Sequence, residues 1–135
     1  MEMPKPSKFL SATQRDGKPL AAEEVYILTW KWIAERKCAM LVSPQLLERY
    51  AMMAARWIQC EEAISEFGFL AKHPTTSSVV QSPYVAMSQS YMSQAQRLWT
   101  EIYQIVKENC AVEYRGITPM DDAIDRLQKE DAYAD

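Results

Sequence analysis

Several features that mark catalytic or membrane proteins are scarce in this chain or missing from it. The 135 residues include three glycines and one histidine. No Gly-rich loop precedes a lysine and a hydroxyl residue, so the usual phosphate cradle of a nucleotide-binding protein is absent. No run approaches the roughly 18 apolar residues of a membrane span. The first residues, MEMPKPSKFL, lack the apolar run of a signal peptide. We therefore expect a cytoplasmic protein with no membrane association.

Metal-binding and redox patterns are also missing. Cys38, Cys60 and Cys110 are far apart and form no Cys-x-x-Cys pair, so we interpret them as reduced thiols. With His73 as the single histidine, the ligand spacing of a zinc site is absent. No Glu-x-x-His motif accompanies the helical glutamates, as helical di-metal sites require. We expect no metal, no cofactor and no enzymatic activity; a helical metal-dependent enzyme remains as the catalytic alternative.

The composition that is present favours one packed domain with unevenly distributed charge. Apolar residue types make up 48% of the chain, and the formal net charge is −3. We predict a flexible basic arm over 1–20, a single helical domain over 21–130, and an acidic tail over 131–135. The arm carries four cations: Lys5, Lys8, Arg15 and Lys18. A basic beginning and an acidic end suggest two different partners, although ordinary solvated charge explains the same pattern.

Helix boundary signals are clear in the central part of the chain. A first helix is expected over 21–37, with acids in its first turn. Ser43-Pro44 and Ser82-Pro83 each combine a capping serine with proline at the first helical position. The two helices that they start should run to Phe67, where Gly68 ends the first, and to Asn109. Similar lengths and a modest connection predict a long antiparallel hairpin.

The apolar spacing of these two helices predicts the seam along which they pack. Positions four and three residues apart alternate in both helices, as in helices that pack side by side at a shallow angle. The seam residues are Leu46, Tyr50, Met53, Trp57, Ile64 and Phe67 in the first helix, and Tyr84, Met87, Tyr91, Leu98, Ile102 and Ile105 in the second. Trp30 lies off the apolar stripe of helix 21–37, and we expect it to be the most exposed of the four tryptophans.

The remaining segments complete an all-α prediction. The stretch 68–82 is a loop or a small hairpin with Val79-Val80 as one arm. Thr118-Pro119 starts a short C-terminal helix, and Asp121 is placed three residues after the threonine as in a capping box.

The order of these features resembles a known family. Tyr50 and Trp57 lie on a long helix that ends in EFG (66–68), and Ser-Pro-Tyr (82–84) opens the next helix. ENCAVEYRGITPMDDAIDRL follows at 108–127. Over roughly 22–128 this order is similar to that of the P27 family of phage terminase small subunits. Many members of that family close with Gly-Leu-Thr-Pro-x-x-Arg, whereas Gly116-Ile117-Thr118-Pro119 is followed here by acids.

The resemblance implies a non-enzymatic subunit that recognises double-stranded viral DNA as a homo-oligomer and delivers it to the large ATPase and nuclease subunit. Our hypothesis assigns DNA contacts to cations of the arm and the first helix: Lys5, Lys8, Arg15, Lys18, Lys31, Arg36 and Lys37. Asp121, Asp122 and Asp125 would face the large subunit, since like charge repels DNA. The alternative is a helical adaptor or regulator that binds only protein, consistent with the acidic net charge.

Overall fold

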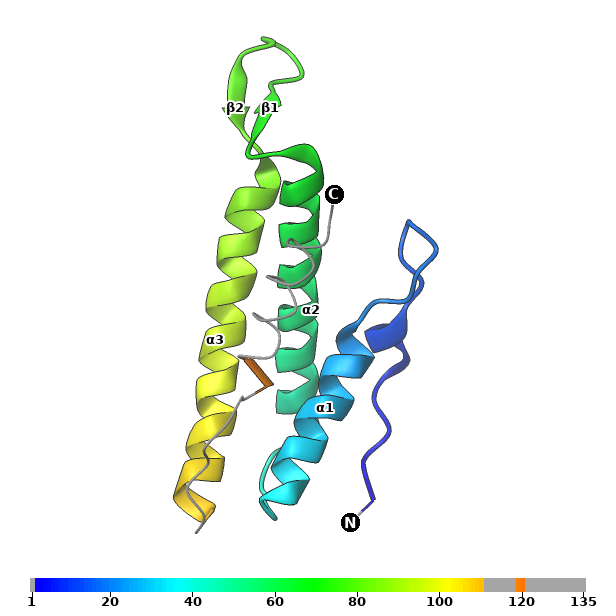
Figure 1. The fold of residues 1–135 in the computed structure, drawn as a ribbon, viewed down its shortest axis with the longest axis vertical. Helices are drawn as coiled ribbons and strands as arrows, with labels where there is room; N and C mark the ends of the chain where they lie inside the picture. The colour runs from blue at the N-terminus through cyan, green and yellow to red at the C-terminus, as the bar shows by residue number, and fades with distance from the viewer. Residues whose placement is uncertain (1, 111–118, 121–135) are drawn as a thin grey trace.

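The structure, a computed structural model, describes residues 2–110 and 119–120 (Figure 1). Its body is an antiparallel pair of long helices, against which a shorter helix packs along part of the length. A two-stranded antiparallel sheet extends from the end where the long helices are joined. In chain order the elements are a 3₁₀ turn η1 (Lys8–Ser11), α1 (Ala22–Glu35), α2 (Pro44–Phe67), β1 (Leu70–Lys72), β2 (Val79–Gln81) and α3 (Pro83–Asn109).

The two Ser-Pro signals start the long helices as predicted. The Ser43 hydroxyl accepts a hydrogen bond from the Leu46 amide at 3.1 Å. The Ser82 hydroxyl accepts one from the Tyr84 amide at 3.4 Å. A proline follows each serine at the first helical positions, where no intrahelical donor is needed. Both starting positions are therefore confirmed.

The two helix ends differ in geometry. Gly68 follows α2 with φ 83° and ψ 174°, a region of backbone space that is essentially restricted to glycine. Helix α1 ends at Glu35, two residues earlier than predicted, and Lys37 takes the left-handed conformation with φ 59°. The Cys38 amide then bonds the Ile33 carbonyl at 3.1 Å, and the Lys37 amide bonds that of Ala34 at 2.9 Å. This is a Schellman motif with lysine in the position usually taken by glycine.

The core is broader than the predicted seam. Tyr50 and Trp99 pack with ring centroids 5.5 Å apart, which joins α2 to α3. Ala51, Ala54 and Ala55 are at most 1% exposed, and their small side chains let neighbouring helices approach closely. Helix α2 is therefore buried on more than the one stripe that the large apolar residues indicate.

The seam residues separate by their position along the hairpin. Phe67, Tyr84 and Met87 are 65%, 37% and 42% exposed, so the seam is open at this end, although the rings of Phe67 and Tyr84 still stack on each other across it. They lie at the β1–β2 end, beyond the part of the hairpin against which α1 packs (Figure 1). The buried seam residues are Tyr50, Trp57, Ile64, Leu98 and Ile102, and the half-buried ones are Leu46, Met53, Tyr91 and Ile105.

The segment between α2 and α3 takes the small-hairpin form. Strands β1 and β2 pair antiparallel, with Leu70 opposite Gln81 and Lys72 opposite Val79. The fold is therefore mostly helical rather than strictly all-α. No helix among residues 2–110 and 119–120 is long and apolar enough to cross a membrane.

Much of the predicted C-terminal helix lies outside the described residues. Pro119 and Met120 are helical, and Met120 is 5% exposed and belongs to the hydrophobic core. The partner-binding candidates Asp121, Asp122 and Asp125 and the tail 131–135 are not described, so these predictions stay predictions.

Candidate nucleic-acid interface

The N-terminal segment is held against the helical body by contacts that the expectation of a flexible arm did not include. The Ser7 amide donates to a carboxylate oxygen of Glu48 on α2 at 3.0 Å. The Ser7 hydroxyl bonds the same carboxylate at 2.9 and 3.1 Å. The Tyr26 hydroxyl donates to the Pro4 carbonyl at 3.1 Å, and Leu10 is completely buried. Lys5 lies between the residue bonded to α1 and the residue bonded to α2, Lys8 directly follows the latter, and both lysines are exposed.

Burial of Tyr26 strengthens this attachment. Loss of solvent contact raises the pKa of its hydroxyl, and the negative charge of Glu48 raises it further. The hydroxyl therefore keeps the proton that it donates to the arm to higher pH than a solvent-exposed tyrosine would.

A tight turn displays the other two cations of the arm. Thr13 and Pro19 form an antiparallel bridge, and the Gln14 amide bonds the Lys18 carbonyl at 2.8 Å. Gly17 allows the turn with φ 85°, outside the range that other residues adopt easily. The side chains of Arg15 and Lys18 are exposed on this turn.

The same turn is bonded to an arginine of α2. The Gln14 side-chain oxygen accepts from the Arg56 guanidinium at 2.9 Å and from the Gln59 amide at 3.1 Å. The guanidinium also donates to the Gln59 oxygen at 2.6 Å. Arg15 is adjacent in sequence to Gln14, so these bonds bring the turn's cation close to the positive charge of Arg56.

Arginines from both long helices line a groove beside the arm. Arg49 of α2 and Arg97 of α3 border a groove of about 570 Å³ that also contacts Phe9 of η1. Met52 and Met53 contribute apolar lining, and Glu48 and Glu101 contribute acidic lining. Since Lys8 precedes Phe9 directly, the arm places a lysine near two exposed arginines that are distant in sequence.

We define the basic surface as Lys5, Lys8, Arg15, Lys18, Arg49, Arg56 and Arg97. Sequence reasoning found the first four and missed the three arginines, which are scattered over α2 and α3. The periodic signal could have suggested Arg49 and Arg56, since residues seven apart share one helix face. Six of these side chains are exposed, and Arg56 is half-buried. Lysine and arginine side chains are suited to contacts with phosphate groups.

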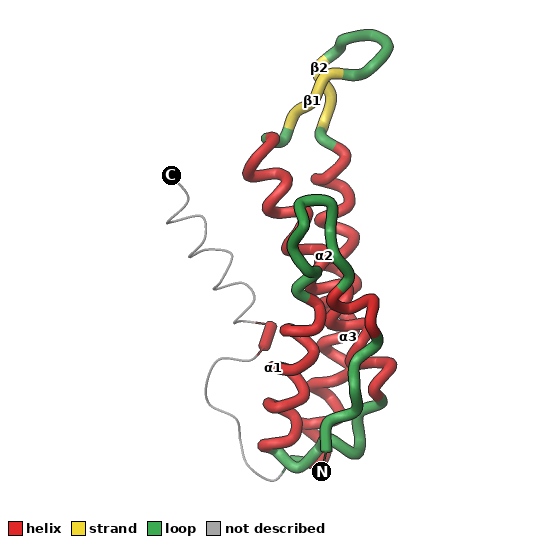
Figure 2. The backbone as a smooth tube through the Cα atoms, turned by 90° about the vertical axis from the view of Figure 1, so that its right-hand side faces the viewer, coloured by secondary structure: helices red, strands yellow, loops and turns green. Residues whose placement is uncertain are grey.

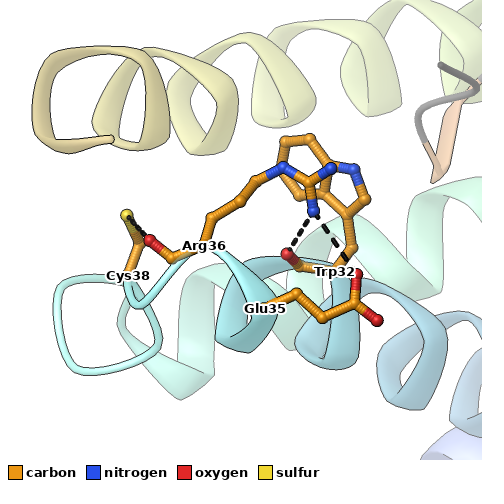
Figure 3. A network of polar contacts seen from close by, with 4 residues as sticks. All are labelled: Trp32, Glu35, Arg36 and Cys38. Atoms are coloured by element: carbon orange, nitrogen blue, oxygen red, sulfur yellow. Dashed lines mark hydrogen bonds and ion pairs between the residues drawn. The ribbon is translucent and has the colours of Figure 1, made fainter. Parts of the chain in front are cut away.

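Of the cations predicted at the end of α1, Arg36 makes several contacts within its own segment (Figure 3). Its guanidinium stacks on the Trp32 ring at 4.2 Å and donates to the Trp32 carbonyl at 2.8 Å. It also lies 3.7 Å from the Glu35 carboxylate, and its side chain is 14% exposed. Arg36 therefore takes part in the packing of α1, a role that the prediction of a DNA-contacting cation did not include.

Three further predictions concern α1. Lys31 and Lys37 are exposed, and Lys31 shares an outward stripe with Glu24 and Glu35. Trp30 is half-buried and packs against the core, whereas the other three tryptophans are buried, so it is the most exposed of the four, as expected.

The titratable groups of the described core show no activated nucleophile. Burial raises the pKa of the Cys38 thiol and of the Cys60 thiol, so both favour the protonated form. No group of three or more His, Cys, Asp or Glu residues that could hold a metal ion occurs in the described part of the chain.

Taken together, the fold and the surface define a class: a helical hairpin protein that carries a docked, cation-bearing N-terminal segment. The sequence model of one family, described as phage terminase, small subunit, matches residues 22–103, which is more than half of the chain. The protein belongs to this family, and hence to the phage DNA-packaging proteins. No curated protein and no solved structure gives a significant match. The matched region contains α1 and α2 entirely and most of α3, whereas the arm precedes it.

Proposed function

We propose that this protein is the DNA-recognition subunit of a phage or prophage packaging terminase, of the P27 type. In this role it binds double-stranded viral DNA as a homo-oligomer and hands it to the large subunit, which supplies ATPase and nuclease activity. The protein itself is not an enzyme and needs no cofactor. It works in the cytoplasm of the bacterial host.

The observation that carries the proposal is the docking of the arm beside two helical arginines. Because Ser7 is bonded to Glu48, the backbone that carries the arm's cations is held against α2 before DNA arrives. Holding a segment in place in advance lowers the entropic cost of binding. The resulting contacts are suited to phosphates, which position a protein on the duplex without reading sequence.

The acidic net charge makes assembly a necessary part of this function. A subunit with formal charge −3 gains little from long-range attraction to DNA. Several copies that present the basic surface to one duplex would sum weak contacts through a high effective concentration. We assign Lys31 and Lys37 a minor role and leave Arg36 out because of its packing on Trp32. Asp121, Asp122 and Asp125 remain our candidates for contact with the large subunit.

A gel-shift series over salt concentration tests the proposal. Reversing the charges of Lys5, Lys8, Arg15 and Lys18 together should weaken binding of a DNA duplex without lowering the melting temperature. Each lost phosphate contact should reduce the slope of log K against log salt by about 0.9. The control reverses the charges of Lys72 and Lys107, which are exposed cations outside the basic surface, and is compared with reversal of Lys5 and Lys8 alone.

The outcomes separate the two candidate functions. The expected result is a salt-dependent shift that the arm variant loses and the control keeps. Absence of any shift down to low salt would favour the protein-binding adaptor and overturn the proposal.

A further inference from the structure

One long stretch of the chain is almost free of charge. Residues 67–96 contain Lys72 and no other charged side chain, although charged residues make up 24% of the whole sequence. At that average, 30 residues would carry about seven charges. The stretch covers the last residue of α2, both strands and the first half of α3. Depletion of charge is typical of the central part of a protein interface.

The same stretch exposes large apolar side chains at one end of the molecule. Figure 2 shows β1 and β2 projecting beyond the ends of α2 and α3. The rings of Phe67 and Tyr84 stack on each other across the hairpin with centroids 6.4 Å apart. We call the following set the distal patch: Phe67, Phe69, Leu70, Val79, Val80, Tyr84 and Met87, which are between 37% and 69% exposed.

The size of the distal patch is that of an interface. With about 200 Å² for a whole aromatic side chain, the exposed fractions of Phe67, Phe69 and Tyr84 amount to about 340 Å². The four aliphatic members add a similar amount, with Leu70 and Val79 on one face of the two-stranded sheet and Val80 on the other. The total over both faces approaches the roughly 800 Å² that each partner contributes to a standard interface, so an occupant that covers it has to enclose the projecting hairpin.

The strands themselves need a partner surface. Each has three residues, and their side chains are mostly exposed. A two-stranded hairpin of this length is marginally stable in water unless another surface covers one of its faces. The open edges of β1 and β2 also offer backbone groups for pairing with a further chain.

Charge decides which occupant fits. DNA is a poor match, because the distal patch contains no cation and Lys72 is the single one in the surrounding stretch 67–96. Residues 121–135 of the same chain are a poor match too, since eight of those fifteen residues are charged. An uncharged apolar surface is best complemented by another of the same kind, and a second copy of this chain supplies one.

We propose that a second copy of this chain covers the distal patch and that this contact assembles the subunits. The inference rests on the proposed function, in which copies must combine before a net-acidic subunit can hold DNA. It leaves the basic surface of each copy open, because the arm and the groove lie along the helical body and the distal patch lies at its end.

The test compares two matched double variants by light scattering of the full-length protein without DNA. Phe69→Glu with Leu70→Glu replaces two adjacent apolar residues that are 69% and 64% exposed. Met40→Glu with Leu41→Glu does the same to an adjacent pair, 83% and 51% exposed, in the α1–α2 connection at the opposite end. Thermal melts by circular dichroism check that each variant is folded.

We expect the wild type and the Met40/Leu41 variant to form the same multimer. The Phe69/Leu70 variant should dissociate with at least about 30-fold weaker self-association, as expected when a central contact is lost. A monomeric wild type at tens of micromolar, or a folded Phe69/Leu70 variant with unchanged mass, would overturn the inference. A multimer that fails to shift DNA would instead overturn the proposed function and leave this contact standing.

Discussion

The attachment of the arm by Glu48 gives the most informative single perturbation. Glu48→Ala removes the carboxylate that accepts from both the amide and the hydroxyl of Ser7. Ser7→Ala removes the hydroxyl and keeps the amide. Glu101→Ala is the matched control, because Glu101 is an acid on the same groove and is exposed.

The structure sets the expected size of each effect. A hydrogen bond to a charged group contributes about 1.5–3 kcal/mol when buried, and less here because Glu48 is half-exposed. Removing the carboxylate that accepts from both donors should therefore lower the free energy of unfolding by about 2 kcal/mol. Removing the hydroxyl alone should lower it by about 1 kcal/mol. For a chain of 135 residues these costs correspond to melting temperatures lower by about 8 °C and 4 °C. Glu101→Ala should stay within about 0.5 kcal/mol of the wild type.

DNA affinity distinguishes the effect of releasing the arm from the effect of removing one negative charge. If charge alone mattered, removing either acid from the groove would strengthen DNA binding by up to about fivefold. We expect this gain for Glu101→Ala. For Glu48→Ala we expect affinity roughly tenfold weaker, because the arm must then be ordered upon binding. Hydrogen exchange at the Leu10 amide, which bonds the Ser7 carbonyl at 3.1 Å, reports release of the arm directly.

Equal behaviour of the two variants would refute this reasoning. If Glu48→Ala and Glu101→Ala change melting temperature, exchange and affinity alike, the Ser7–Glu48 bonds do not order the basic surface.

Three further changes test local features. Gly68→Ala should lower the free energy of unfolding by about 1–3 kcal/mol in a denaturant titration, through backbone strain alone, because a Cβ there meets no atom within 4 Å. Unchanged stability would contradict the backbone geometry at the end of α2. Arg36→Ala should cost about 1–2 kcal/mol through its lost stacking and leave the salt slope of DNA binding unchanged; a shallower slope would return Arg36 to the interface. Alkaline pH should destabilise the fold. The thiols of Cys38 and Cys60 and the hydroxyl of Tyr26 have pKa values raised above 9.0 and 10.0, so their contribution is complete below about pH 9 and is lost as pH rises through the raised values. Thermal melts from pH 7 to 11 should show the decline starting near pH 9, and a flat profile would oppose it.

Local signals explain why the helical hairpin was predictable. Ser43 and Ser82 cap helices through bonds to amides two or three residues away, so a short stretch of sequence contains the whole signal. The same holds for Gly68, whose positive φ ends α2. Such features need no knowledge of the tertiary fold.

The basic surface depends on contacts that sequence spacing does not reveal. Ser7 and Glu48 are 41 residues apart, and Gln14 and Arg56 are 42 apart. Nothing in the arm's composition of prolines and cations indicates that it docks on α2. The residue that indicates docking of the arm is Leu10, a single apolar residue that is completely buried.

The packing role of Arg36 has a simple physical origin. Arg36 and Trp32 are four residues apart, so one stacks on the other across a helical turn. Arg36, a cation near the end of a helix, was interpreted as available for contact with DNA phosphates. Its long side chain can instead cover an aromatic ring. The exposure of Phe67, Tyr84 and Met87 was missed for a different reason. Their spacing continues the seam, but α1 packs along a different part of the hairpin.

The central claim is that the arm and the two long helices bind DNA through one surface. The most direct measurement is the salt dependence of duplex binding by Arg49→Ala with Arg97→Ala, compared with Lys72→Ala with Lys107→Ala. The account predicts that the arginine pair reduces the slope by about 1.8 for each bound subunit and that the lysine pair leaves it unchanged. Equal slopes for the arginine variant and the wild type would contradict the claim.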